Sequence, residues 1–140
     1  MAVFPMSSIS LQCGDCLELM NNISDKSVDC IVTDLPYQQT SRNKWDVIIP
    51  FEPLWEQYKR IAKDNAAIIL FANGMFTAEL MMSNKQMWRY NLIWEKTQPT
   101  GFLNAKKMPL RSHEDICIFY KKPPVYNPQK TTGHVRKLRK

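Results

Sequence analysis

Long apolar segments are missing from this sequence of 140 residues. No run approaches the roughly 20 consecutive apolar residues that a membrane-spanning helix needs. The first residues, Met1–Pro5, carry neither a basic region nor the long apolar stretch of an export signal. These absences predict a cytoplasmic protein, in which the four cysteines are expected to be free thiols.

Glycine and acidic residues are also scarce. The chain has four glycines, none of them in a Gly-rich loop, and 13 Asp and Glu residues against 19 Lys and Arg, which gives a formal charge of +6. After residue 105, the many basic side chains face only two acids, Glu114 and Asp115. This basic part is either a solvated surface or a set of contacts to nucleic-acid phosphates, and the sequence leaves both interpretations open.

The residues that are present predict one folded domain with a tail. A hydrophobic content of 44% excludes a disordered chain, and the length is typical of a single domain. We expect residues 1–122 to form that domain. Pro123, Pro124 and Pro128 interrupt regular structure, so residues 123–140 are predicted to be a basic, flexible tail.

The apolar periodicity predicts strands that alternate with helices. Asp15 and Glu18 have the spacing of a capping box and mark the start of a helix, and Pro53 suits the first turn of another that begins near Phe51. A further helix is expected at 75–82, and strands at 9–12, 28–33, 66–72, 90–96 and 115–121. This order predicts an α/β fold with a mostly parallel, partial Rossmann-like sheet. Because no helix is evident between the last two strands, they are expected to form an antiparallel pair at one edge.

Asp34-Leu35-Pro36-Tyr37 follows the predicted strand that ends at Thr33. In open α/β sheets, ligands bind beyond the carboxyl ends of the strands. The Asp34 carboxylate and a backbone carbonyl of the Leu35-Pro36 turn can both accept hydrogen bonds from an exocyclic amine. These acceptors would stabilise the positive charge that develops when a methyl group is transferred to that amine. The aromatic ring of Tyr37 offers a surface on which a flipped base could stack.

These residues resemble the signature of the N6-adenine and N4-cytosine DNA methyltransferases, which is Asp-Pro-Pro-Tyr or a close variant. The similarity begins at Gly14-Asp15-Cys16-Leu17-Glu18 and continues through Trp45-Asp46, Trp94-Glu95-Lys96 and Asn104-Ala105-Lys106 to Tyr120, so it covers nearly the whole chain. The order of motifs is similar to the circularly permuted arrangement found in phage and prophage enzymes, in which the catalytic region precedes the cofactor loop. Leu35 departs from the signature, which usually has Pro at this position.

The resemblance implies transfer of a methyl group from S-adenosyl-L-methionine to a base of double-stranded DNA, in a site-specific enzyme of the restriction–modification type. It favours adenine N6 over cytosine N4, although no residue here distinguishes the two bases. The catalytic residues would be Asp34, Leu35, Pro36 and Tyr37. Asp15 would contact the cofactor, and Trp45, Lys106 and Arg111 would contact DNA. No metal site is expected.

The resemblance also implies a missing part. Related chains carry a Gly-rich loop downstream that binds the methionine end of the cofactor, and no such loop occurs before Lys140. We therefore expect a truncated or split form, in which a second chain could supply the cofactor-binding half. The strand that ends at Asp34 would then have an unpaired edge. The alternative is an inactive remnant that at most binds nucleic acid.

Several other interpretations compete with this one. Cys13 and Cys16 form a C-x-x-C pair between a predicted strand and helix, as in thioredoxin-like redox sites, but the expected flanking residues are absent. His113 is interpreted as structural, because methyl transfer to an amine needs no strong base. Trp55, Trp88 and Trp94 are interpreted as core residues. Methylation of a protein amide is typical of Asn-Pro-Pro-Tyr enzymes, and Asp34 favours a base instead.

Overall fold

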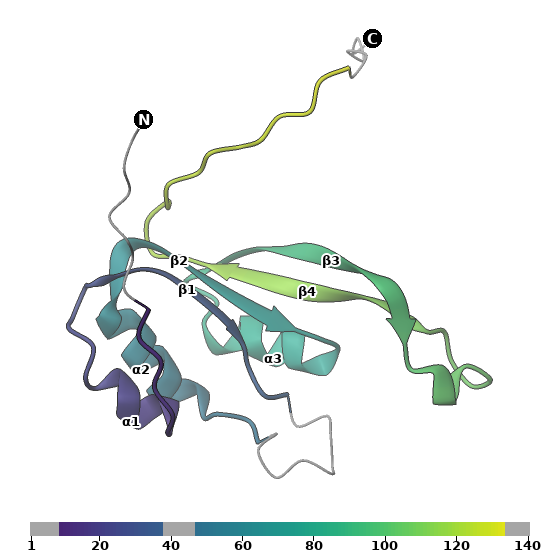
Figure 1. Ribbon diagram of the computed structural model, residues 1–140, viewed down its shortest axis with the longest axis horizontal. Coiled ribbons are helices and arrows are strands. Elements are labelled where there is room, and N and C mark those ends of the chain that lie inside the picture. The colour runs from purple at the N-terminus through teal and green to yellow at the C-terminus, as the bar shows by residue number, and fades with distance from the viewer. Residues whose placement is uncertain (1–8, 38–46, 134–140) are drawn as a thin grey trace.

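The computed structural model describes residues 9–37 and 47–133 (Figure 1). Along the chain, the described elements alternate between helices and strands, and a hairpin closes the sequence. They are α1 (Cys16–Met20), β1 (Val28–Asp34), α2 (Phe51–Ile61), β2 (Ala62–Ala72), α3 (Met75–Ser83), β3 (Trp88–Thr100), the short 3-10 helix η1 (Phe102–Asn104) and β4 (Arg111–Phe119).

The described strands form one mixed sheet in the order β1-β2-β4-β3. β1 pairs with β2 in parallel, while β4 is antiparallel to both β2 and β3. The α/β class and the antiparallel pair at one edge are therefore confirmed. β1 forms the other edge, and among the described residues it pairs on one side only.

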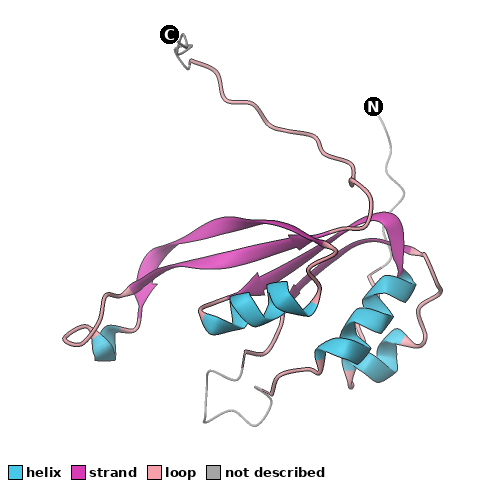
Figure 2. Cartoon of the chain, turned by 180° about the vertical axis from the view of Figure 1, so that it is seen from behind, coloured by secondary structure: helices cyan, strands magenta, loops and turns pink. Residues whose placement is uncertain are grey.

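The helices α1, α2 and α3 all lie on one face of the sheet, as Figures 1 and 2 both show. Along β2, the side chains of Ile68, Leu70 and Ala72 are fully buried against these helices. The alternate residues point to the opposite face, which we call the open face because no described helix covers it. From the strand registers, the open face includes Val32, Asp34, Ile69, Phe71, Leu92, Trp94 and Glu114.

Several predicted elements differ from the structure. Residues 9–12 form no strand, because no described strand lies beside them; Leu11 is 91% exposed. The last two strands are longer than predicted, since much of the expected connection between residues 97 and 114 joins the hairpin. Pro99 is accommodated where the β3–β4 register shifts, a position at which proline removes no regular ladder hydrogen bond.

Beyond β4, the described residues 121–133 contain no helix or strand and extend away from the sheet (Figure 1). The division of the chain near residue 122 stays a prediction. No helix in the described ranges has the length and apolar character needed to cross a membrane.

Arg60, near the end of α2, forms hydrogen bonds with the segment that links α1 to β1 and so holds this segment against α2. Its guanidinium donates to the carbonyl oxygens of Met20 and Ile23, each at 2.7 Å, and to the carboxylate of Asp25 at 2.6 Å. It also donates to Gln57 on its own helix. The planar guanidinium can satisfy these acceptors simultaneously, which fixes α1, and with it Asp15, against α2.

We predict that Arg60→Met lowers the free energy of unfolding by about 2 kcal/mol, because the Asp25 carboxylate and the Met20 and Ile23 carbonyl oxygens, the Met20 one in a part-buried bond, lose their donor. Chemical denaturation of the purified variant measures this change. The control is Lys63→Met, which removes an exposed ion pair with Asp29 and should change stability by less than about 0.5 kcal/mol. Equal effects of the two substitutions would contradict the role assigned to Arg60.

Candidate functional site

The Asp34-Leu35-Pro36-Tyr37 turn lies where β1 ends, at the carboxyl end of the parallel strand pair. Asp34 is exposed, whereas Leu35 is buried in the core and anchors the turn. The hydroxyl of Tyr37 donates a hydrogen bond to Oδ1 of Asp34. The Tyr37 ring packs against Phe76 of α3, with 5.0 Å between ring centroids. The carboxylate is therefore held in one orientation, and no described residue donates to its second oxygen, which can accept from another donor.

Tyr37 is also held in its protonated form. Partial burial, the hydrogen bond to Asp34 and the negative charges of Asp34 and Glu114 all raise the pKa of the Tyr37 hydroxyl. A hydroxyl that stays protonated continues to donate to Asp34 across the physiological pH range. The negative charge of Glu114, on β4, thus acts on the turn that follows β1.

One cavity is lined by two of the predicted site residues, Asp15 and Pro36. A pocket of about 400 Å³ is lined by Asp15 and its neighbours at the start of α1, by Pro36, and by the segment that precedes α2. Its lining residues are Gly14, Asp15, Cys16, Leu17, Pro36, Val47, Ile48, Ile49 and Pro50. Asp15 also caps α1, because its Oδ1 accepts from the backbone N–H of Leu17 at 2.8 Å. No sequence pattern indicated that residues 47–50 contribute to this pocket.

A group of side chains on the open face lies beside the Asp34 turn. Phe71 is the direct partner of Asp34 in the β1–β2 ladder, and its ring contacts the ring of Trp94 edge-on at 5.5 Å. Trp94 pairs with Glu114, which forms an ion pair with Lys96. The interpretation of Trp88 and Trp94 as core residues is wrong, since both are exposed, Trp94 to 51%, while Trp55 is buried as expected. Only the alternation of Trp94 and Lys96 along one strand could have indicated a shared face.

The structure separates the predicted DNA contacts from this group. Lys106 follows η1 at the tip of the β3–β4 hairpin, which projects beyond the rest of the sheet (Figure 1). Arg111 begins β4 opposite Thr100 and is exposed. Trp45 lies outside the described residues.

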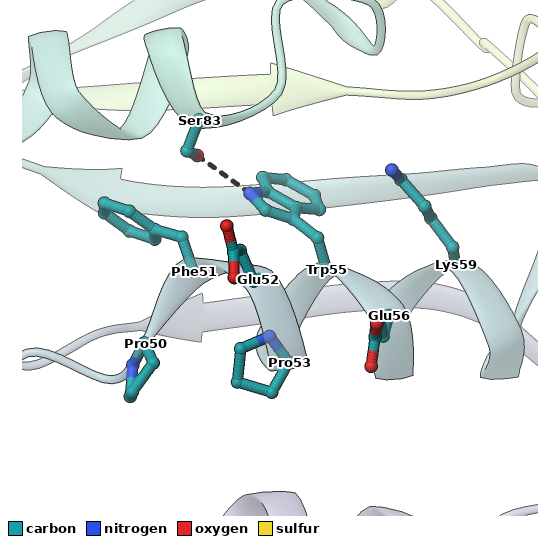
Figure 3. A pocket seen from close by; sticks show the side chains of 8 residues that line it. All are labelled: Pro50, Phe51, Glu52, Pro53, Trp55, Glu56, Lys59 and Ser83. Atoms are coloured by element: carbon teal, nitrogen blue, oxygen red, sulfur yellow. Dashed lines mark hydrogen bonds between the residues drawn. The ribbon is translucent and has the colours of Figure 1, made fainter.

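A larger pocket, of about 680 Å³, occupies the helix face and contains none of the predicted site residues. The close view in Figure 3 shows it along α2, where the indole Nε1 of Trp55 donates to Oγ of Ser83 at 2.8 Å. Its lining residues are Pro50, Phe51, Glu52, Pro53, Trp55, Glu56, Lys59 and Ser83. The hydrogen bond links α2 to α3, so this pocket lies where the two helices meet.

The cysteines in the described ranges form no disulfide and no metal site. Cys13, Cys16 and Cys30 are exposed free thiols, and Cys117 is a buried one. Within these ranges, no three His, Cys, Asp or Glu side chains gather in a geometry that could hold a metal ion.

Several known proteins are similar to this chain, although no protein-family model matches it. The chain is 26% identical over 149 residues to the type II methyltransferase M.HinfI of Haemophilus influenzae, which covers 87% of this chain and 41% of that protein. The structure of the M1.HpyAVI–SAM complex matches with a TM-score of 0.62 and 18% identity, over 88% of this chain and 62% of that one. The cytosine-N4-specific PvuII DNA methyltransferase matches with a TM-score of 0.62 and 11% identity, over 79% of this chain and 49% of that one.

These similarities define the class of fold. The chain has a methyltransferase-like α/β fold. In sequence and structure it resembles the N6-adenine and N4-cytosine DNA methyltransferases, as the Asp34 signature indicated. The chain spans about half the length of the relatives it matches.

Tyr58 of α2 contacts β1 on the helix-covered face of the sheet. Its buried hydroxyl is hydrogen-bonded to the side chain of Thr33, the residue before Asp34. Burial raises the pKa of Tyr58 to about 12, and the bond to Thr33 opposes this rise only in part. Since the pKa in the folded state exceeds that of the unfolded chain, the folded state binds the proton more tightly between about pH 10 and 12.

We predict that the stabilisation from protonated Tyr58 is complete below about pH 10 and is lost as the pH rises to about 12, at a cost of about 2 kcal/mol. Tyr58→Phe keeps the ring and removes the titrating group, so its stability should fall less over this interval. Urea denaturation of both proteins from pH 9 to 12 measures the difference. Parallel curves would contradict a buried, protonated hydroxyl beneath β1.

Proposed function

We propose that this chain carries the catalytic part of a site-specific DNA methyltransferase that modifies an exocyclic amino group. The observation that carries the proposal is the Asp34 turn, with an oriented, exposed carboxylate at the carboxyl end of β1. The cavity that joins Pro36 to Asp15 supports it, because a donor molecule bound there would lie next to this turn. The similarity to M.HinfI over 87% of the chain supports the same chemistry.

The residues of the turn would act as hydrogen-bond acceptors. The free oxygen of the Asp34 carboxylate and the carbonyl oxygen of Leu35 would each accept one N–H of the amine. This arrangement weakens the delocalisation of the nitrogen lone pair into the base ring and stabilises the positive charge as the N–CH3 bond forms. Tyr37 holds Asp34 in position through its hydroxyl. The released proton would pass to water.

The residues present fit one part of S-adenosyl-L-methionine. When bound, this cofactor supplies a methyl group on a positively charged sulfur. The pocket of about 400 Å³ falls in the usual range for small molecules, roughly 300 to 1,000 Å³. Asp15 would accept hydrogen bonds from the hydroxyls of the adenosine end, and Pro36 would line the wall toward the turn.

Double-stranded DNA is the proposed substrate, with a target base flipped out of the helix. Lys106 and Arg111 are exposed on the projecting hairpin, where they could contact backbone phosphates. Trp45 is kept as a proposed contact on the basis of the sequence. We place adenine N6 first as the acceptor and cytosine N4 second, and analysis of the methylated nucleosides separates the two.

We predict that Asp34→Ala lowers methyl transfer by at least about 100-fold, because charge stabilisation at the amine is lost. The assay uses labelled S-adenosyl-L-methionine, DNA, the chain and a polypeptide that carries a Gly-rich cofactor loop. Asp29→Ala is the matched control, since Asp29 lies on the same strand, is exposed and pairs only with Lys63 in the interactions described. Unchanged transfer by the Asp34 variant would refute the catalytic assignment.

We further propose that a second polypeptide segment completes the cofactor site along the free edge of β1. Three features support this partner. β1 is an edge strand whose outer backbone groups have no described ladder partner. Val32 on its open face is 61% exposed. Residues 9–12 extend without a strand beside them. An unpaired, apolar edge of this kind favours strand pairing with another segment.

We predict that the 140-residue chain alone binds S-adenosyl-L-methionine weakly, because Asp15 and the Asp34 turn contact only part of the molecule. Isothermal titration calorimetry should detect no micromolar binding by the chain alone. Addition of a polypeptide bearing the Gly-rich loop should restore it. Tight binding by the chain alone would contradict the need for a partner, and a folded complex without binding would favour the inactive remnant.

A further inference from the structure

The Lys96–Glu114 ion pair is the most shielded one in the described part of the chain. Its side chains are 19% and 18% exposed, whereas every other described ion pair has at least one partner more than a third exposed. Removing two charges from water is costly, and well-packed apolar residues would stabilise a sheet at least as well. Stability alone therefore does not explain a shielded pair at this position, and we consider a role in ligand recognition.

The pair lies on the same face and toward the same end of the sheet as the Asp34 turn. Phe71 sits directly beside Asp34 in the ladder and contacts Trp94, and Trp94 is the ladder partner of Glu114. β1 and β4 are separated only by β2, so their backbones are about 10 Å apart. Phe71, on β2, therefore lies between the Asp34 turn and the ion pair in the order of the strands.

Both members of the ion pair line a cavity. It has a volume of about 320 Å³ and is lined by Trp94, Lys96, Thr97, Gln98 and Glu114. It combines an aromatic surface, an ammonium group and amide and hydroxyl side chains, which suit a polar aromatic ligand better than an aliphatic one.

We propose that Trp94 and Lys96 form the wall of the target-base pocket opposite Asp34. The indole of Trp94 packs against the base, and the ammonium of Lys96, held in place by Glu114, donates to the ring nitrogen next to the amine. This inference rests on the proposed function, because it assumes that Asp34 accepts from that amine. Glu114 neutralises Lys96, so the pocket adds no net positive charge near the developing ammonium on the base.

The arrangement would select bases by hydrogen-bond pattern. Adenine and cytosine both present an amine donor beside a ring-nitrogen acceptor, which matches an Asp34 acceptor beside a Lys96 donor. Thymine and guanine present a carbonyl acceptor beside a ring N–H donor, which is the reverse order. A reversed base would leave both protein groups unpaired. Asp34 and Lys96 together would therefore determine which class of base is accepted, which makes Lys96 a specificity-determining residue.

The test compares binding of the full chain to single-stranded oligonucleotides of equal length, made of dA, dC, dT or abasic residues, by fluorescence anisotropy at one salt concentration. We expect the chain to bind the dA and dC strands about tenfold more tightly than the dT strand. Lys96→Met should reduce this preference to less than about twofold. Trp94→Ala should weaken binding to all strands that carry bases, while binding to the abasic strand stays unchanged.

The variant Lys96→Met leaves the Glu114 carboxylate without its partner, so the double variant Lys96→Met/Glu114→Gln is measured beside it, and thermal melting monitors the fold. Loss of the preference in a folded double variant supports the inference. A preference that survives in it overturns the inference. An equal loss on every strand, the abasic one included, also overturns it, since Lys96 would then contact phosphate.

Asp34→Ala, which removes the side-chain acceptor, separates the inference from the proposed function on which it rests. If Asp34→Ala abolishes the preference and Lys96→Met does not, the inference is wrong and amine recognition by Asp34 stands. If the unmodified chain shows no preference for dA and dC over dT, amine recognition fails, and the inference fails with it. Lys63→Met, remote from the turn, controls for the loss of one positive charge.

Discussion

The parallel pairing of β1 with β2 is the constraint on which the candidate site depends. It places Asp34 opposite Phe71 at the strand ends, and every other contact of the site follows from that register. Thr33 then points toward Tyr58 on the helix face, while Asp34 points to the open face. A shift of one residue would exchange these two side chains and bury the carboxylate. The buried Leu35 and the Tyr37 hydroxyl hold the turn beyond the strand.

Much of the fold could be predicted from the sequence, because the signals were local. The apolar run at 28–33, the periodicity that begins at Phe51 and the Asn73-Gly74 break each gave an element close to its observed bounds. The absence of a helix between the last two strands predicted their antiparallel pairing, which is confirmed. The prediction of a strand at residues 9–12 is wrong. The alternation of apolar and polar residues indicates only a tendency to form a strand, and a stable strand also needs a neighbouring strand to pair with.

The candidate site was only partly accessible to sequence reasoning. The motif at Asp34 could be identified because its residues are contiguous and their chemistry is specific. The Lys96–Glu114 pair and the Phe71–Trp94 contact join residues from β2, β3 and β4, and single-sequence periodicity contains no information on which strands become neighbours. The same reason explains why Trp94 was taken for a core residue: its position on the open face follows from the register.

Helices on one face alone leave this sheet asymmetric. Sheets with parallel strands are usually covered on both faces, and here Val32, Leu92 and Trp94 remain exposed on the open face. The free edge of β1 and the open face adjoin the Asp34 turn, so a segment that paired there would enclose the site as well as extend the sheet.

The central claim is that the Asp34 turn recognises an exocyclic amine. The most direct measurement is a titration of the ¹⁵N-labelled chain with 2′-deoxyadenosine and, separately, with purine 2′-deoxyriboside, which lacks only that amine. The account predicts that the backbone resonances of Leu35 and Tyr37 shift with the first nucleoside and stay in place with the second, because only the amine can donate to Asp34 and the Leu35 carbonyl. Equal shifts with both nucleosides, or shifts confined to residues remote from the turn, would contradict it.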